Sequence, residues 1–193
     1  MKDKDKLQKE INDCSLCGNL KKLTENSIQI GTAPFIIIGE SPAKDGWIVS
    51  KRAFYNKDNN LQSTGKVLEK LLNNIGLSID DIYFTECCKC IIEDRKQLEK
   101  CSQNCLPILH KQLNQLPCKI LIPMGKHPTQ ALLGIKIKKF ADYVGKEFNI
   151  KIYDREYIVL PIYHPSPLNP KGYKDNVPIF DKLKNNKKTK KDS

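Results

Sequence analysis

The sequence predicts an α/β protein, a three-layer α/β/α sandwich around a central, mostly parallel sheet of four strands. Short apolar runs alternate along the chain with longer segments whose apolar side chains recur at helical spacing. A strand that is apolar at every position is typical of a sheet covered by helices on both faces. The length of 193 residues, 39% of them hydrophobic, suits one domain with one buried core.

The first strand-helix unit lies in the first half of the chain. Residues 34–39 form a continuous apolar run ending at Gly39, which predicts a buried strand. Residues 61–76 predict a helix, because apolar residues recur there at helical spacing and Gly76 provides a stop. Residues 81–85 predict the next strand.

The second half of the chain repeats this alternation. Residues 96–116 predict a helix, and residues 119–124 predict a strand. Residues 128–133 predict a short helix that begins with proline in its first turn. Residues 150–153 and 157–161 flank three polar residues and predict a hairpin whose second arm completes the sheet.

Polar residues and a glycine follow four of these strands. In a parallel sheet, ligands bind at the carboxyl ends of the strands. Glu40, Glu86, Gly125 and His164 all lie at such ends. The sequence therefore predicts one cleft that these residues share.

The charge distribution bears on partners and on domain limits. A formal net charge of +11 points to a polyanionic partner, because lysines and arginines release counterions from phosphates. We expect a single domain over residues 1–180 and a basic, disordered tail over residues 181–193, where the lysines lack apolar periodicity. Residues 1–9 are too charged for a signal peptide, and no later run is long enough to cross a bilayer. We expect a cytoplasmic, nucleoid-associated monomer with no membrane partner.

Eight cysteines suggest metal or cluster binding. A reducing cytoplasm keeps thiols free, so ligation is the leading explanation for an ordered subset. Cys14 and Cys17 have the two-residue gap that lets two thiolates hold one metal centre. Further cysteines lie between the second predicted strand and the following helix, and one stands alone: Cys87, Cys88, Cys90, Cys101, Cys105 and Cys118.

Two motifs resemble the iron-sulfur, family-four branch of the uracil-DNA glycosylase superfamily. Gly39-Glu40-Ser41-Pro42 resembles the family's GEAPG motif, and His164-Pro165-Ser166 resembles its HPS motif. Lys89-Cys90 resembles the family's KC dipeptide, and 105–109 resembles its C-x-P-x-L segment. The resemblance covers residues 11 to 170 in matched segments. It implies a uracil-DNA glycosylase-like fold and a hydrolase of base excision repair, which cleaves the N-glycosidic bond of a flipped, deaminated base, chiefly uracil, in DNA.

The resemblance also implies a cofactor. It assigns Cys14, Cys17, Cys90 and Cys105 to a [4Fe-4S] cluster that staples the amino-terminal arm to the middle of the chain. Zinc in a four-thiolate site is the alternative, which spacing leaves open. Cys101 is the substitute for Cys105, while Cys87 and Cys88 are expected to pack as small hydrophobes.

Glycosidic cleavage needs groups that stabilise a cationic sugar and an anionic base. By resemblance, Glu40 orients the attacking water and His164 donates to the leaving base. Asp45 competes with Glu40, because the segment after the first motif departs from the family pattern. Taken alone, Glu40 could equally be a capping carboxylate and His164 a buried hydrogen-bonded side chain.

The remaining predicted contacts concern the base. Gly39 and Ser41 border it, and Phe54 resembles the family's stacking aromatic, with a core phenylalanine as the alternative. Glu86 stands where the family has asparagine. An ionised carboxylate only accepts hydrogen bonds, so Glu86 would have to be protonated to donate to uracil O4, and burial favours that form. Hypoxanthine presents the same adjacent donor and acceptor.

Predicted DNA contacts lie in two segments. The proline-rich loop 165–171 would enter the minor groove, with Leu168 as the wedge. Lys126 opens a helix whose amides could hold a phosphate. The full set of predicted DNA-binding residues is Ser166, Pro167, Leu168, Lys126 and Lys171.

Three other functions remain open from the sequence. One is a non-catalytic iron-sulfur or zinc DNA-binding protein of the same fold, and a related one is a zinc-stapled nucleotide-binding protein. Another is a glycosylase for a different deaminated base such as hypoxanthine.

Overall fold

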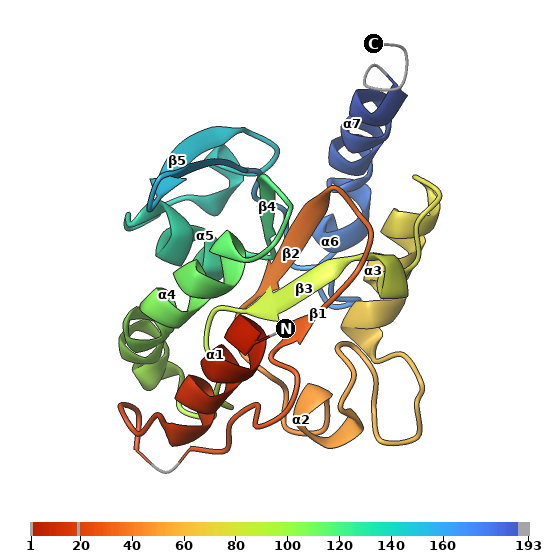
Figure 1. Cartoon of the computed structure of the whole chain (residues 1–193). Helices are drawn as coiled ribbons and strands as arrows, with labels where there is room; N and C mark the ends of the chain where they lie inside the picture. Colours follow the sequence, from red (N-terminus) through yellow and green to blue (C-terminus); the bar gives the residue numbers. More distant parts are fainter. Residues whose placement is uncertain (1, 19, 189–193) are drawn as a thin grey trace.

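The computed structural model describes residues 2–18 and 20–188 and has a six-stranded sheet at its centre (Figure 1). The strand order is β1-β3-β2-β4-β6-β5. The strands are β1 (Ile28–Gln29), β2 (Phe35–Gly39), β3 (Tyr83–Glu86), β4 (Ile120–Pro123), β5 (Phe148–Ile152) and β6 (Arg155–Val159). The inner four run parallel, whereas β1 and β5 pair antiparallel at the two edges. The predicted class is confirmed, but the sheet has six strands rather than four.

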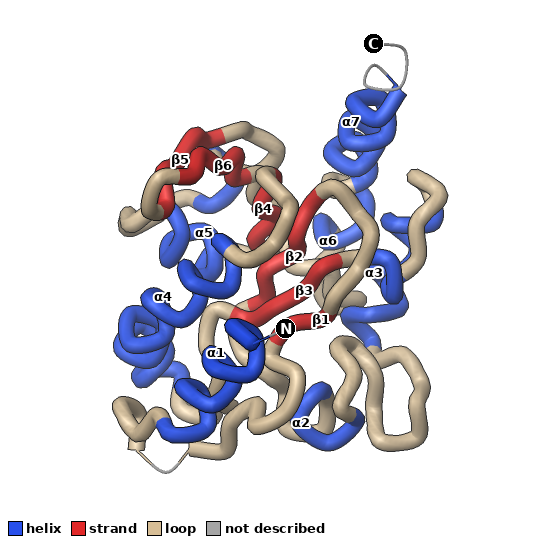
Figure 2. The backbone as a smooth tube through the Cα atoms, in the orientation of Figure 1, coloured by secondary structure: helices blue, strands red, loops and turns tan. Residues whose placement is uncertain are grey.

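Helices cover both faces of the sheet (Figure 2). Helices α3, α6 and α7 lie on one face, and α1, α4 and α5 lie on the other. The helices are α1 (Lys2–Asp13), α2 (Trp47–Ser50), α3 (Ser63–Asn73), α4 (Leu98–Asn114), α5 (Lys126–Leu133), α6 (Lys171–Lys174) and α7 (Val177–Lys188). Three short 3₁₀ turns are η1 (Ile79–Asp81), η2 (Arg95–Gln97) and η3 (Phe140–Asp142).

Strand β2 shows why the sheet needs two helical layers. Its side chains alternate between the faces because the period of a strand is two residues. Phe35 and Ile37 pack with the core beneath α3 and α7. Ile36 and Ile38 pack with the core beneath α4 and α5. All four are fully buried, which explains the uninterrupted apolar run in the sequence.

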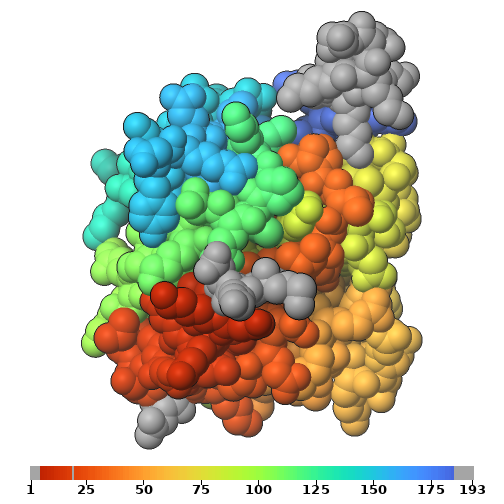
Figure 3. All heavy atoms as spheres, viewed as in Figure 1, coloured from red at the N-terminus to blue at the C-terminus, as the bar shows by residue number. Residues whose placement is uncertain are grey.

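The amino-terminal helix α1 was not predicted. Leu7 and Ile11 lie one helical turn apart and pack against Ile108 of α4. Lys111 of α4 also pairs with Glu10, with Nζ 2.7 Å from Oε1. Figure 3 shows this segment in red beside the green of α4. Two apolar residues in a charged stretch are thus enough to dock the helix.

The prediction of a disordered tail from residue 181 is wrong for residues 181–188, because helix α7 continues to Lys188. Ile179, Phe180 and Leu183 of this helix are buried against the core. These contacts fix the helix and carry it into the lysine-rich segment, because packing outweighs local propensity. Residues 189–193 lie outside the described part of the chain. Within the described part, no helix is long and apolar enough to cross a membrane.

Candidate active site

A cleft of about 780 Å³ opens at the carboxyl edge of the parallel strands. Gly39 ends β2, Glu86 ends β3, and Gly125 and His164 follow β4 and β6. The predicted convergence at this edge is therefore confirmed in position. The lining residues include, besides these four, Glu40, Ser41, Trp47, Phe54, Phe84, Arg95, Lys126 and His127.

Glu40 is the polar residue nearest the end of β2, and it forms an ion pair with Arg95. The Arg95 guanidinium donates to both carboxylate oxygens, with Nη2 3.0 Å from Oε2. The pairing raises the pKa of the Arg95 guanidinium. The Glu40 side chain is 24% exposed and that of Arg95 is 66% exposed. Sequence reasoning missed Arg95, since it lies in the turn η2 and reaches Glu40 only through the fold.

His164 stands across the cleft with access to solvent. Desolvation by surrounding protein atoms lowers the pKa of its imidazole below the ordinary value, and the Glu40 carboxylate partly opposes this. The imidazole is therefore neutral at pH 7 and carries one N–H donor. The backbone carbonyl of His164 accepts hydrogen bonds from the Ser166 amide at 2.8 Å and from Asn169 Nδ2 at 3.1 Å.

A buried asparagine holds the segment that carries His164. The Tyr163 amide donates to Asn176 Oδ1 at 3.0 Å, and Asn176 Nδ2 donates to the carbonyls of Tyr163 and Gly172, each at 2.8 Å. Asn176 is completely buried between α6 and α7. Both helices thus fix the approach of the chain to the cleft.

Aromatic rings form one wall of the cleft. The rings of Phe54 and Phe84 lie 4.4 Å apart between centroids, and Trp47 packs on Phe84 at 5.4 Å. Phe54 is 8% exposed and has a positive φ of 69°, a conformation that costs energy outside glycine. The ring belongs to the core, as the alternative interpretation expects, and it also lines the cleft, so its stacking on a base stays a prediction.

Glu86 lies beside Gly39 in the register of β3 and β2. It is 9% exposed, and its Oε2 is buried without a hydrogen-bond partner among the described residues. Burial raises the pKa of the carboxyl to about 8, the Lys89 ammonium opposes this rise and Glu40 adds to it. Glu86 is therefore mostly neutral at pH 7.

Some predicted residues lie outside the cleft lining. Asp45 is exposed, and its backbone carbonyl accepts a hydrogen bond from Gln62 Nε2 at 3.4 Å. Asp45 is thus not among the residues that line the cleft with Glu40 and His164. The predicted DNA-binding loop follows His164, and Leu168 at its tip is 95% exposed. Ser166, Pro167 and Lys171 belong to the same loop region, whereas Lys126 lies in the lining itself.

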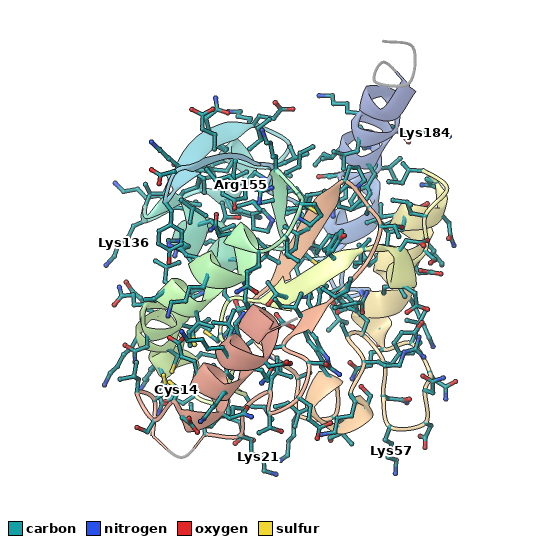
Figure 4. All side chains as sticks on the ribbon, viewed as in Figure 1. Cys14, Lys21, Lys57, Lys136, Arg155 and Lys184 are labelled. Atoms are coloured by element: carbon teal, nitrogen blue, oxygen red, sulfur yellow. The ribbon has the colours of Figure 1, made fainter. Side chains whose placement is uncertain are left out.

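The predicted cysteine ligands converge from three segments of the chain. Burial raises the pKa of the Cys90 thiol to about 11, and the thiols of Cys105, Cys17 and Cys14 add to that rise. Asn104 Nδ2 donates to Cys17 Sγ at 3.4 Å. Figure 4 shows Cys14 with sulfur atoms nearby, between α1 and α4. Within residues 2–18 and 20–188, no group of three or more histidine, cysteine or acidic side chains is arranged to hold a metal ion.

Three further cysteines lie close to this group in the sequence, and Cys88 packs in one cluster with Cys101, Cys17 and Cys90. Cys87 and Cys88 are buried among apolar residues. Cys101 is buried beside Cys17, with which its thiol forms a hydrogen bond, so it lies near the converging group. All eight cysteines are free thiols.

The chain belongs to the uracil DNA glycosylase superfamily, whose family model matches residues 26–186. It is 28% identical over 174 residues to a type-4 uracil-DNA glycosylase of Saccharolobus solfataricus, covering 86% of this chain and 77% of that protein. It is also 26% identical to a type-4 uracil-DNA glycosylase of Sulfurisphaera tokodaii over 84% of this chain and 74% of that protein. A type-4 uracil-DNA glycosylase of Archaeoglobus fulgidus is 24% identical to this chain, and the match covers 86% of this chain and 83% of that protein.

Proposed function

We propose that this protein is a uracil-DNA glycosylase of base excision repair, a hydrolase that removes uracil from DNA. The observation that carries the proposal is the position of Glu40 and His164, which line one cleft from the ends of two parallel strands. Family membership and the names of the relatives support the same activity.

The reaction is a displacement at C1′ of the deoxyribose. As the bond from C1′ to the base nitrogen breaks, its electron pair stays on the base and positive charge develops on the sugar. The Glu40 carboxylate stabilises that charge, orients a water toward C1′ and accepts a proton from the water as the new C–O bond forms. The neutral His164 imidazole donates its N–H to the oxygen of the anionic base. Phe54 stacks on the flipped base.

DNA is held at the rim of this cleft. Lys126 at the start of α5 and Lys171 in α6 are both exposed and would meet phosphates. Leu168 would fill the gap that the flipped nucleotide leaves, since a side chain 95% exposed on a proline-rich loop is free to insert. The proposal includes a nucleoid-associated monomer in the cytoplasm, where the substrate lies.

The test is excision from an oligonucleotide that carries one uracil, measured at single turnover. We expect His164→Ala to lower the rate by about a hundredfold or more, the range for losing one donor to a developing anion, with little change in DNA binding. His110→Ala is the matched control, because His110 lies on α4 against Tyr153, away from the cleft. Its rate should equal that of the wild type.

Two results would overturn the proposal. A wild type that binds DNA but releases no uracil would indicate a non-catalytic DNA-binding protein. A wild type that releases hypoxanthine and leaves uracil in place would indicate a glycosylase for another deaminated base.

We further propose that Cys14, Cys17, Cys90 and Cys105 hold a [4Fe-4S] cluster. Four free thiols from three segments of the chain are donors of the type that such a cluster takes. Burial raises the pKa of the Cys90 and Cys105 thiols, and the nearby thiols of Cys14 and Cys17 add to that rise. Its role would be structural: it would join the segment after α1 to the segment after β3 and to the middle of α4.

Colour and metal content test the cluster. Anaerobically purified protein should be brown and contain about four irons per chain. Cys105→Ser should bleach it, whereas Cys118→Ser should leave the colour unchanged, because Cys118 is buried near Arg155 and apart from the four thiols. If the purified protein is colourless and contains stoichiometric zinc, the four thiols hold zinc and the cluster proposal is wrong.

A further inference from the structure

The floor of the cleft contains a carboxyl group whose hydrogen bonding is incomplete. Glu86 Oε2 is buried and has no partner among the described residues, although Glu86 lines the cleft. A buried polar atom without a partner costs free energy, so its retention calls for an explanation. A ligand that enters the cleft can supply the missing hydrogen bond.

We propose that Glu86 reads the flipped base as a neutral carboxylic acid. Its O–H donates to a carbonyl oxygen of the base, and its C=O accepts the N–H of the adjacent ring nitrogen. The inference rests on the proposed function and deepens it by defining the substrate class. That class comprises bases with a carbonyl beside a ring N–H, such as uracil with O4 and N3–H or hypoxanthine with O6 and N1–H.

The neighbouring strand fixes the position of this carboxyl. A Cβ on Gly39 would lie 2.0 Å from Glu86 Oε2 and 2.9 Å from Phe84 Cζ. The carboxyl therefore occupies the space that a side chain at position 39 would take. Only glycine at the end of β2 lets the acid reach the cleft floor beside the aromatic wall.

The buried Lys89 side chain, whose charge acts on Glu86, makes its hydrogen bonds elsewhere. Lys89 is almost fully buried, and its ammonium donates to Thr85 Oγ1 at 2.8 Å and to the backbone carbonyl of Glu86. Oε2 receives none of these hydrogen bonds. Lys89 thus bonds the backbone carbonyl at the end of β3, and Glu86 Oε2 stays without a partner from the described residues.

Desolvation sets the protonation of Glu86, and its charged and titratable neighbours modify it. Lys89 on the following turn lowers its pKa, and Glu40 at the end of β2 raises it, but desolvation is the largest effect and brings the pKa to about 8. The Cys87 thiol beside it is neutral, because burial raises its pKa to about 12. Below pH 8 the protonated acid therefore predominates and can donate. Above pH 8 the carboxylate accumulates, and it can only accept.

The decisive comparison is between the wild type and Glu86→Gln. Glutamine has the shape of the protonated acid and keeps one donor and one acceptor at every pH, so it is a matched control for ionisation. Single-turnover release of uracil should be measured from about pH 6 to about pH 9.5. We expect the wild-type rate to fall about tenfold for each pH unit above the pKa of Glu86, while the rate of Glu86→Gln stays level.

Other outcomes separate the inference from the proposed function. A level wild-type profile, a parallel fall in Glu86→Gln, or a folded but inactive Glu86→Gln would each overturn the reading of the base by a neutral acid, while uracil release by the wild type would still support the glycosylase. A wild type and a Glu86→Gln variant that both fold, bind DNA and release no uracil at any pH would overturn the glycosylase itself. Melting temperatures of both proteins establish that they are folded.

Discussion

At the scale of single residues, the ion pair with Arg95 fixes the orientation of the Glu40 carboxylate, the proposed catalytic group. A guanidinium that bonds both oxygens of a carboxylate fixes its plane as well as its charge. The Arg95 side chain is largely exposed, so the pair contributes little to the free energy of folding. Its effect is to orient Glu40, and we regard Arg95 as a positioning residue.

Replacing Arg95 should therefore change catalysis more than stability. We expect Arg95→Ala to lower the single-turnover rate of uracil release by about ten- to a hundredfold, since small displacements of a catalytic group have effects of that size. Arg95→Lys should recover only part of the rate, because an ammonium cannot bond both oxygens in the same plane. Lys139→Ala is the control, since Lys139 forms an exposed pair with Asp142 at 3.7 Å. Equal rates in Arg95→Ala and wild type would refute the positioning role.

The sequence anticipated part of this site for a simple reason. Glu40, Glu86 and His164 each follow a parallel strand, and the carboxyl ends of such strands meet at one edge. Arg95 and His127 come from a turn and from the start of a helix, so their approach depends on the path of the connecting segments. His127 Nδ1 is buried and has no hydrogen-bond partner among the described residues. The sequence contains no pattern that predicts this.

At the scale of elements, continuous apolar runs were easier to predict than sparse ones. Strand β2 and helices α3 and α4 have dense apolar patterns, and each was anticipated within a few residues. Leu7 and Ile11 of helix α1 are buried in an otherwise charged stretch, and Ile179, Phe180 and Leu183 of α7 lie beside lysines, so neither helix shows a dense apolar pattern in the sequence. The two-residue strand β1 is too short to carry a pattern. Tertiary contacts define these three elements.

The junction between α6 and α7 is an element-scale device that positions His164. Asn176→Ala would remove one buried and two partly buried hydrogen bonds and leave the Tyr163 amide and two carbonyls without these partners. We expect the free energy of unfolding to fall by about 1–3 kcal/mol, as for a buried group left unsatisfied. The rate of uracil release should fall as well, because Tyr163 precedes His164. Urea denaturation and single-turnover kinetics measure the two effects.

Asn149→Ala is the control for that variant. Asn149 is exposed on the edge strand β5, far along the sheet from the cleft. It should alter neither quantity. An Asn176→Ala protein with wild-type stability and wild-type rate would show that the junction does not hold the His164 segment.

At the scale of the whole molecule, basic side chains lie both beside the cleft and far from it. Lys126 and Lys171 lie by the cleft, whereas α7 runs away from it, so that Lys184 donates to the Asn74 carbonyl at the far end of α3. Figure 1 shows α7 and α2 at opposite ends of the molecule, and α2 contains Trp47 of the cleft. The net charge of +11 is therefore larger than the positive charge that would face DNA bound at the cleft.

Salt dependence can resolve these two groups of lysines. Each phosphate contact adds about 0.9 to the negative slope of log K against log salt concentration. We expect Lys126→Gln and Lys171→Gln each to reduce that slope by about one for a uracil-containing duplex, and Lys184→Gln to leave it unchanged. Fluorescence anisotropy over a salt series gives the slopes. A larger loss in Lys184→Gln than in Lys126→Gln would place the DNA on the opposite end of the molecule.

The docking of α1 on α4 has a consequence for how the chain is made. Glu10 and its partner Lys111 are separated by 101 positions, so α1 leaves the ribosome long before the surface that receives it exists. Until α4 has been synthesised, Leu7 and Ile11 have no apolar partner there, and the helix is too short and too charged to persist alone. Attachment of the amino-terminal arm is thus a late step of folding, paced by translation of the middle of the chain.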